Sequence, residues 1–347
     1  MRLVLALGAA LTILATACGG AQAPGAAAPA VATGAVQTAT AVSGQFTLYT
    51  SVPQNIASRI EESLKKRHPD LRMTIFRAGT GEVVAKLAAE QKAGAIQADV
   101  VWVAEPSAYE EFKKQELLLK FAPKDADKLS AELKDADGFY YAGRLINTVI
   151  IYNTQLVKTP PTGWRDLTKP EFKGKIGLPT PAASGAAVAF VGALSKSSDF
   201  GYGYLAELKA NGAVQVQNNT EANTKVAKGE LMVASTLDYM IRDLKTQGSP
   251  VDIVWPKEGA IFTPSPVGIV KTSKNVEASK AFVDYLLSQQ GQQDMVEVGS
   301  FLPVRDDVAP PKGAPKLSEI KRFPLDWKDI TARTEEIKKN FADIFGR

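Results

Sequence analysis

Cysteine occurs once in this chain of 347 residues, at Cys18, and this residue limits both the fold and its setting. A single thiol forms no internal disulfide, so the folded part must be held together by its apolar core. Cys18 follows Arg2, an apolar run over 3–15 and the small residues Thr16 and Ala17. This order is typical of a secretory signal, and the run is shorter than the roughly 20 residues that a membrane span needs. We expect a signal peptide over 1–17.

Residues 14–18 read Leu-Ala-Thr-Ala-Cys, a pattern similar to the lipobox at which lipoproteins are cleaved and lipidated. We therefore expect lipidation at Cys18, which would place the protein outside the cytoplasm, in the periplasm or at the cell surface, anchored to the membrane. The alternative is a plain secretory signal in which Cys18 has no role. Residues 18–43 are small or polar, and no charged residue occurs between Arg2 and Arg59. Such a segment has too few large apolar residues to build a core, so we interpret it as a flexible tether.

The charge balance argues against nucleic acid as a partner. The chain has 41 basic and 37 acidic residues, a formal net charge of +4, and no cluster that would give a basic footprint.

From residue 45 onward, apolar runs of strand length alternate with segments of helical periodicity. Strands are expected over 46–49, 71–76, 99–103, 148–152, 176–178, 231–235 and 251–254, with helices between them. Such alternation is typical of an α/β fold, and we expect two mainly parallel sheets. Pro264 and Pro266 interrupt the apolar stretch over 260–270, which argues against a regular central strand there. Helices are also expected over 275–288 and 329–345.

Several short motifs, taken in order, resemble a known family. They are Leu48-Tyr49-Thr50-Ser51, Arg77-Ala78-Gly79-Thr80-Gly81-Glu82, Ala98-Asp99-Val100-Val101-Trp102, 143–154, Trp164-Arg165-Asp166-Leu167, Phe172-Lys173-Gly174-Lys175-Ile176, Ala183-Ser184-Gly185-Ala186, Leu237-Asp238-Tyr239 and Pro264-Ser265-Pro266. Together they resemble the type II periplasmic-binding-protein fold of the solute-binding proteins that include ferric-iron and 2-aminoethylphosphonate binders.

This resemblance implies a two-lobed molecule that closes on its ligand by a hinge motion. Lobe I would comprise 44–148 plus 265–347, and lobe II 149–264, with the hinge near 148–153 and 262–267. The implied partners are a small-molecule ligand and the membrane permease of an ABC importer. We expect a monomer.

Candidate ligand-binding residues lie where strands give way to helices. Ser184-Gly185-Ala186 and Gly79-Thr80-Gly81 each precede a helix, and Ser51 stands just before another. Helix N-termini present unpaired N–H groups and the positive end of the helix dipole, both of which suit an anion. The alternative for each is an ordinary helix cap or turn. The resemblance to the family implies an anion contact at Ser184-Gly185-Ala186.

Four further polar positions are candidates. Arg144 could hold phosphate or carboxylate oxygens through its planar guanidinium, or lie in solvent before a strand. Glu105 could face an ammonium group or a metal, or lie on the surface. Asn219 resembles an amide that contacts anions in the family, although Asn-Asn pairs also form turns.

Asp238-Tyr239 bears most on the kind of ligand. Family members that bind ferric iron tend to carry two adjacent tyrosines at this place, whereas here Asp238 replaces the first. His68, the one histidine, follows a basic run at a predicted helix end. Asp238 could instead pair with an ammonium or sugar hydroxyl, and Tyr239 could simply pack.

We therefore predict a binding protein for a small anionic solute, such as a phosphonate or a sugar phosphate. A ferric-iron binder using Tyr239 is the first alternative, and the metal ligands are left open. An extracytoplasmic enzyme is the second, but the sequence has no Gly-x-Ser-x-Gly, no His-Glu-x-x-His and no cysteine nucleophile. No cofactor is expected.

Overall fold

The computed structural model describes residues 43–346, so the signal peptide, Cys18 and nearly all of the tether lie outside the described residues. Nine strands form in the described part: β1 (Gly44–Thr50), β2 (Leu71–Arg77), β3 (Val100–Trp102), β4 (Tyr141–Asn153), β5 (Ile176–Pro179), β6 (Val214–Val216), β7 (Val233–Leu237), β8 (Val251–Val254) and β9 (Ile261–Ile269).

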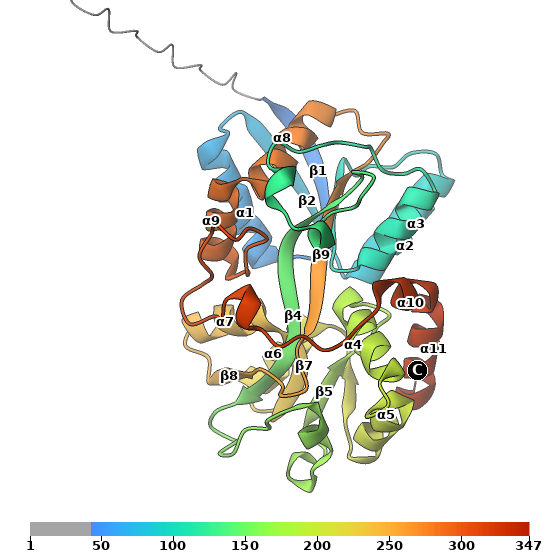
Figure 1. Cartoon of the computed structure of the whole chain (residues 1–347), viewed down its shortest axis with the longest axis vertical. Coiled ribbons are helices and arrows are strands. Elements are labelled where there is room, and N and C mark those ends of the chain that lie inside the picture. Colours follow the sequence, from blue (N-terminus) through green and yellow to red (C-terminus); the bar gives the residue numbers. More distant parts are fainter. Residues whose placement is uncertain (1–42, 347) are drawn as a thin grey trace, which may run out of the picture. The chain divides into compact units, whose positions relative to one another are not determined.

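The helices of the same part are α1 (Gln54–Arg67), α2 (Thr80–Lys92), α3 (Pro106–Lys114), α4 (Gly185–Lys196), α5 (Gly201–Ala210), α6 (Asn219–Ala227), α7 (Asp238–Thr246), α8 (Val276–Leu287), α9 (Gln289–Gly299), α10 (Trp327–Ala332) and α11 (Thr334–Phe345). Strands and helices alternate along most of this length, as the sequence predicts for an α/β fold (Figure 1).

All the described strands belong to one mixed sheet, so the prediction of two mainly parallel sheets is wrong. The order is β2-β1-β3-β9-β4-β7-β5-β6, with β8 paired to β4. Pairs β1/β2, β1/β3, β5/β6 and β5/β7 are parallel, whereas every pair that involves β4 or β9 is antiparallel. β4 is 13 residues long and joins the two parallel parts, because its first part pairs with β9 and its last part with β7 and β8.

The expectation that residues 260–270 avoid a central strand is also wrong. β9 is buried along its whole length between β3 and β4. The ladder with β3 covers only residues 267–269, so Pro266 lies beyond its end. There the Pro266 carbonyl accepts a hydrogen bond from Tyr109 Oη at 2.6 Å. On the side of β3, therefore, no strand pairs with Pro264 or Pro266, although both pair with β4, opposite Leu145 and Ala142. A proline is tolerated in a strand when its missing N–H would face an unpaired side.

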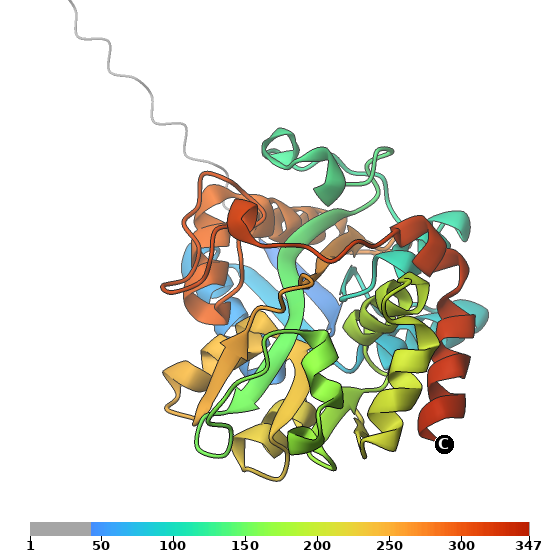
Figure 2. The same cartoon turned by 60° about the horizontal axis from the view of Figure 1, so that its bottom comes forward.

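Helix α1 shows how the sequence pattern becomes packing. Its buried residues include Ile56, Ile60 and Leu64, four residues apart, and its last turn is basic, which complements the negative end of the helix dipole. At the other end of the chain, the helix predicted over 329–345 is interrupted at Arg333 and forms α10 and α11. Helix α11 packs on α4 and α5, and α10 contacts α3 and α4 (Figure 2).

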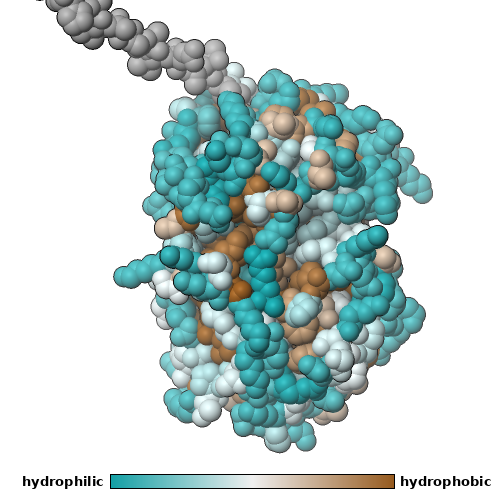
Figure 3. Space-filling model, viewed as in Figure 1, coloured by the Kyte–Doolittle hydropathy of each residue, from teal (hydrophilic) through white to brown (hydrophobic). Residues whose placement is uncertain are grey.

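The exterior of the described part is polar. Polar side chains cover most of the face in Figure 3, and apolar residues show mainly in its hollowed middle. Among residues 43–346, only Leu156 and Val214 are large apolar side chains that are exposed. In this part of the chain every helix is too short or too polar to cross a membrane.

Candidate functional site

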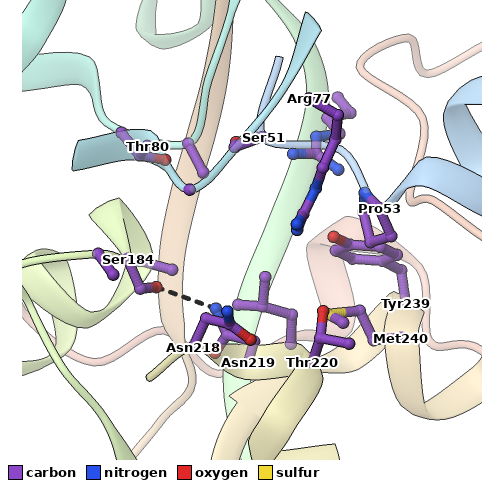
Figure 4. A pocket seen from close by; sticks show the side chains of 16 residues that line it. Ser51, Pro53, Arg77, Thr80, Ser184, Asn218, Asn219, Thr220, Tyr239 and Met240 are labelled. Atoms are coloured by element: carbon purple, nitrogen blue, oxygen red, sulfur yellow. Dashed lines mark hydrogen bonds between the residues drawn. The ribbon is translucent and has the colours of Figure 1, made fainter. Parts of the chain in front are cut away.

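A pocket lies at the carboxyl ends of the parallel strands, where ligands bind in open α/β sheets (Figure 4). Segments that follow β1, β2 and β3 line one side, segments that follow β5, β6 and β7 line the other, and β4 supplies Arg144. The lining residues are Ser51, Pro53, Arg77, Gly79, Thr80, Ala104, Arg144, Ala183, Ser184, Ala186, Asn218, Asn219, Thr220, Leu237, Tyr239 and Met240.

Five helices begin at this pocket. The residues that cap α1, α2, α4, α6 and α7 are Pro53, Gly79, Ser184, Asn218 and Leu237, and every one of them lines it. Each helix N-terminus carries the equivalent of roughly half a positive charge and unpaired N–H groups. Five such ends around one pocket make its interior electropositive and favour an anion.

Side chains cap only two of these five helices. Ser184 Oγ accepts from the Ala187 N–H at 3.3 Å, and Asn219 Nδ2 donates to the same oxygen at 2.9 Å. Asn218 Oδ1 accepts from the Glu221 N–H at 3.0 Å. At α1, α2 and α7, within the described chain, no side chain caps the first turn. Apart from the Ile56 N–H, which donates to the Pro53 carbonyl at 3.0 Å, the N–H groups of those turns are left for water or a ligand.

Arg144 is the most strongly constrained charge at the pocket. Its side chain is 1% exposed, and Nε donates to Ser265 Oγ at 3.2 Å. The guanidinium carbon lies 5.3, 5.2 and 4.9 Å from the ring centroids of Trp102, Tyr239 and Phe301, which is within the range of cation–π attraction.

Within the part of the chain that the structure describes, Arg144 has no counter-charge. Its Nη1 atom is buried and makes no hydrogen bond within the described residues, and no carboxylate of residues 43–346 forms an ion pair with it. A buried cation without a partner is costly, and an anion in the pocket would offset that cost.

Two more polar groups stand near Arg144. Arg77 ends β2 and donates from Nε to the Val52 carbonyl at 3.3 Å. Ser51 Oγ is buried and makes no hydrogen bond within the described part. Arg77 was not predicted from the sequence, although a basic residue at the end of a strand, two residues before Gly79, is a signal for it.

Tyr239 presents a neutral phenol to the pocket. It is 1% exposed and packs on Phe301, with ring centroids 4.6 Å apart. Burial raises the pKa of Tyr239 above its ordinary value, although the charges of Arg144 and Arg77 act in the opposite direction. The phenol therefore keeps its proton at neutral pH.

The structure brings eight of the twelve predicted binding residues to this one pocket: Ser51, Gly79, Thr80, Arg144, Ser184, Ala186, Asn219 and Tyr239. Their part in ligand binding stays a prediction. The other eight lining residues were not selected from the sequence: Pro53, Arg77, Ala104, Ala183, Asn218, Thr220, Leu237 and Met240.

Two of the four remaining candidates, Gly81 and Gly185, lie where backbone meets backbone. A Cβ atom on Gly81 would overlap the Ala182 carbonyl. One on Gly185 would overlap the Ala104 carbonyl and lie 2.6 Å from Glu105 Cβ. These glycines therefore let the segment before α4 approach the segments that follow β2 and β3, and their contact with a ligand stays a prediction.

The other two, Glu105 and Asp238, are buried outside the lining. Ser107 Oγ donates to Glu105 at 3.1 Å, and burial raises the pKa of this carboxyl, while the charge of Lys338 lowers it. Asp238 is fully buried, and it accepts from the Asn147 N–H at 2.9 Å and from Arg242 Nη2 at 2.7 Å. The Asp238 carboxylate thus already has its counter-charge.

The described residues offer no ready-made metal centre of the common ligand types. Among residues 43–346, no three His, Cys, Asp or Glu side chains gather closely enough to hold an ion. His68 lies beyond the end of α1, half-buried, with its ring 6.0 Å from that of Tyr285.

Comparison with known proteins identifies relatives of this chain. A family model described as "Bacterial extracellular solute-binding protein" matches residues 96–333. A periplasmic protein of Salmonella typhimurium, provisionally named as 2-aminoethylphosphonate-binding, is 32% identical over 268 residues, which cover 73% of this chain and 77% of the relative.

Solved structures share the fold. The periplasmic binding protein AfuA from Actinobacillus pleuropneumoniae, with fructose-6-phosphate bound, superposes with a TM-score of 0.79 at 22% identity, over 87% of this chain and 98% of its own. Iron-bound HitA from Pseudomonas aeruginosa gives a TM-score of 0.74 at 22% identity, over 86% of this chain and 99% of its own. At these identities the similarity concerns the fold and not the ligand.

Proposed function

The chain belongs to the family of bacterial extracellular solute-binding proteins, and on that premise we propose that it captures a small anionic solute, phosphonate-like or sugar-phosphate-like, in the pocket around Arg144. The resemblance inferred from the sequence motifs is thereby confirmed, as is the α/β periplasmic-binding-protein fold. The protein is a substrate-binding component of an ABC transporter that acts outside the cytoplasm, and it is not an enzyme.

One observation carries the choice of an anion. Arg144 is a buried guanidinium with an unpartnered Nη1, held against three aromatic rings and lacking a carboxylate partner among the described residues. Because the first turns of five helices surround the same pocket, the positive potential there exceeds that of one arginine alone. An oxyanion would satisfy both the guanidinium and the helix N–H groups.

We further propose that the pocket opens and closes by a hinge. Lobe I would comprise 44–148 plus 265–347, lobe II would comprise 149–264, and β4 and β9 would bend where they cross. Opening would part the segment before α4 from the segments that follow β2 and β3. The close approach at Gly79, where a Cβ atom would lie 2.7 Å from the Ala183 carbonyl, supports a closed arrangement of these segments.

The proposal also covers the membrane anchor, the tether and the oligomeric state. Lipidation at Cys18 would tether it to the membrane, and residues 18–43 would let the folded part reach the permease. We propose that it works there as a monomer and without a cofactor.

A thermal-shift screen tests the proposed ligand class. The panel would contain phosphonates, sugar phosphates, polyols, amino acids and ferric iron. A ligand at 100 times its Kd stabilises the folded state by about 2.7 kcal/mol. For ~150–250 residues, 1 kcal/mol raises the melting temperature by about 2–4 °C. We expect stabilisation by phosphorus oxyanions, and stabilisation by polyols or amino acids alone would contradict the proposal.

A further inference from the structure

The lining of the pocket has two chemically distinct sides. Arg77 and Ser51 stand on one side, and Asn218, Asn219 and Thr220, at the start of α6, stand on the other (Figure 4). Arg144, from β4, also lines the pocket. The first side supplies positive charge, whereas the second supplies amides and a hydroxyl that both donate and accept hydrogen bonds.

In the described part of the chain, no carboxylate at the pocket balances this positive charge. Among the described residues that line the pocket, none is Asp or Glu. Three of the acidic side chains nearest in sequence are already engaged: Asp238 pairs with Arg242, Glu221 accepts from the Gln217 N–H, and Glu105 accepts from Ser107. A fourth, Glu82 in the first turn of α2, is exposed and does not line the pocket. An ammonium group on a ligand would therefore sit among two guanidiniums and five helix N-termini without a counter-charge, which is unfavourable.

The side formed by α6 suits hydroxyl groups. Asn218 uses Oδ1 to cap α6, and its amide NH2 group makes no hydrogen bond to another described residue. Asn219 Nδ2 donates to Ser184 Oγ at 2.9 Å, which leaves the Asn219 Oδ1 as an acceptor. A ligand hydroxyl can donate to one such group and accept from the next, whereas an ammonium group only donates.

Building on the proposed function, we infer that the solute joins a phosphate or phosphonate group to an uncharged, hydroxylated remainder, and that ligands with an ammonium group in that remainder bind more weakly. The anion lies against Arg144 and Arg77, and the hydroxyl groups face Asn218, Asn219 and Thr220. The Salmonella typhimurium relative is named for 2-aminoethylphosphonate, a ligand that carries an amine. The ligand preference that we infer for this chain is therefore a different one.

Matched ligand pairs test this inference by titration calorimetry at neutral pH. The pairs are 2-hydroxyethylphosphonate against 2-aminoethylphosphonate, and glucose 6-phosphate against glucosamine 6-phosphate, with methylphosphonate and inorganic phosphate as anions without a remainder. We expect the hydroxyl member of at least one pair to bind ~10-fold or more tightly than the amine. Equal or tighter binding of both amines overturns the inference and leaves anion binding intact. If no phosphorus oxyanion binds, the proposed function fails as well.

A variant sharpens the test. Asn219→Asp places a carboxylate at the pocket and adds a second acidic residue, beside Glu221, to the first turn of α6, where the helix dipole favours negative charge. We expect it to shift the hydroxyl-to-amine affinity ratio toward the amine by ~10-fold or more. Gln215→Glu, at an exposed position of β6 outside the lining, adds the same charge and serves as the control. An unchanged ratio in Asn219→Asp, or an equal shift in the control, contradicts the assignment of this side to the remainder.

Discussion

Gly185 at the start of α4 lies so close to Glu105 that a Cβ atom on the glycine would stand 2.6 Å from Glu105 Cβ and would overlap the Ala104 carbonyl. The two segments come from opposite sides of the pocket, one after β3 and the other after β5. Their contact is therefore the place where a small substitution should act on closure without altering Arg144 or the polar lining.

Gly185→Val tests that contact. We expect weaker binding of the phosphorus oxyanion found in the screen, because the added side chain overpacks the closed arrangement. This overpacking costs about 1–3 kcal/mol, and opening relieves it. Calorimetry gives the affinity, and thermal unfolding without ligand shows whether the variant folds. Gly203→Ala, where an added Cβ atom meets nothing within 4 Å, is the control. A folded Gly185→Val protein with normal affinity would contradict this role.

Arg144→Met separates binding from stability. We expect the oxyanion affinity to fall by about 2–5 kcal/mol, as when one partner of a buried, hydrogen-bonded charge pair is removed. The melting temperature of the ligand-free protein should stay the same or rise, because an apolar side chain replaces a buried charge without a counter-ion.

The matched control for Arg144 is Arg322→Met. Arg322 also stacks on an aromatic ring, with its guanidinium carbon 3.9 Å from the Phe262 centroid, but it pairs with Glu132 and lies outside the pocket. Its replacement should leave the oxyanion affinity unchanged. An Arg144→Met protein that loses stability but binds normally would show that the arginine is a structural residue.

Asp238→Asn should act on folding rather than on binding. Asp238 and Arg242 form an ion pair of 2.7 Å with side chains 0% and 9% exposed, and breaking a buried pair costs about 3–5 kcal/mol. Asp252→Asn breaks the more exposed pair with Lys245 and should cost about 0–1 kcal/mol. Urea unfolding measures both. Lost affinity at normal stability would instead make Asp238 a ligand contact.

The role of Asp238 could not be decided from the sequence. A carboxylate at the start of a helix, beside a tyrosine, is equally compatible with a ligand contact and with an internal ion pair. The choice depends on Asn147 and Arg242, and Asn147 approaches Asp238 only because β4 and β7 pair in the sheet. Helix starts at Gly79 and Ser184 were predictable because glycine and serine after an apolar strand are local signals.

The sheet was predictable strand by strand but not as a whole. The short apolar runs at β1, β2 and β8 specify strands locally, with β8 expected at the four residues where it occurs. Whether strands join one sheet or two depends on β4, whose first part contains Gly143 and Arg144 and does not read as an apolar run. β9 was not predicted, because Pro264 and Pro266 argue against a strand. Whether a strand tolerates a proline depends on whether another strand pairs with it at that residue, which the sequence does not show.

Cys18→Ala tests the proposed anchor. If Cys18 is lipidated, its removal should move the protein from the membrane fraction to the soluble extracytoplasmic fraction. The oxyanion affinity should be unchanged, because the pocket is built from residues 51–240. Fractionation followed by immunoblotting measures the shift, and an integral membrane protein controls for incomplete separation. Unchanged membrane association of Cys18→Ala would leave a lipid at this cysteine without support.

Ferric iron is the remaining alternative ligand, and we expect the protein not to bind it tightly. Iron bound by tyrosine needs the phenolate, but burial raises the pKa of Tyr239, and the neighbouring guanidiniums of Arg144 and Arg77 repel a trivalent cation. The charge of these arginines favours the phenolate, but the cost of burying it is the larger effect. At neutral pH the Tyr239 phenol should therefore keep its proton, and ionise only at a pH above that of an exposed tyrosine.

Titration with ferric citrate distinguishes the two ligand classes. We expect no saturable visible charge-transfer band, together with stabilisation by a phosphorus oxyanion in the same preparation. Tyr239→Phe should cost the oxyanion only about 0.5–1.5 kcal/mol, the worth of one hydrogen bond, because Arg144 and the helix N-termini supply most of the attraction. A one-to-one band that disappears in Tyr239→Phe would contradict the anion assignment. It would favour a ferric-iron site in which Tyr239 and an external anion hold the metal.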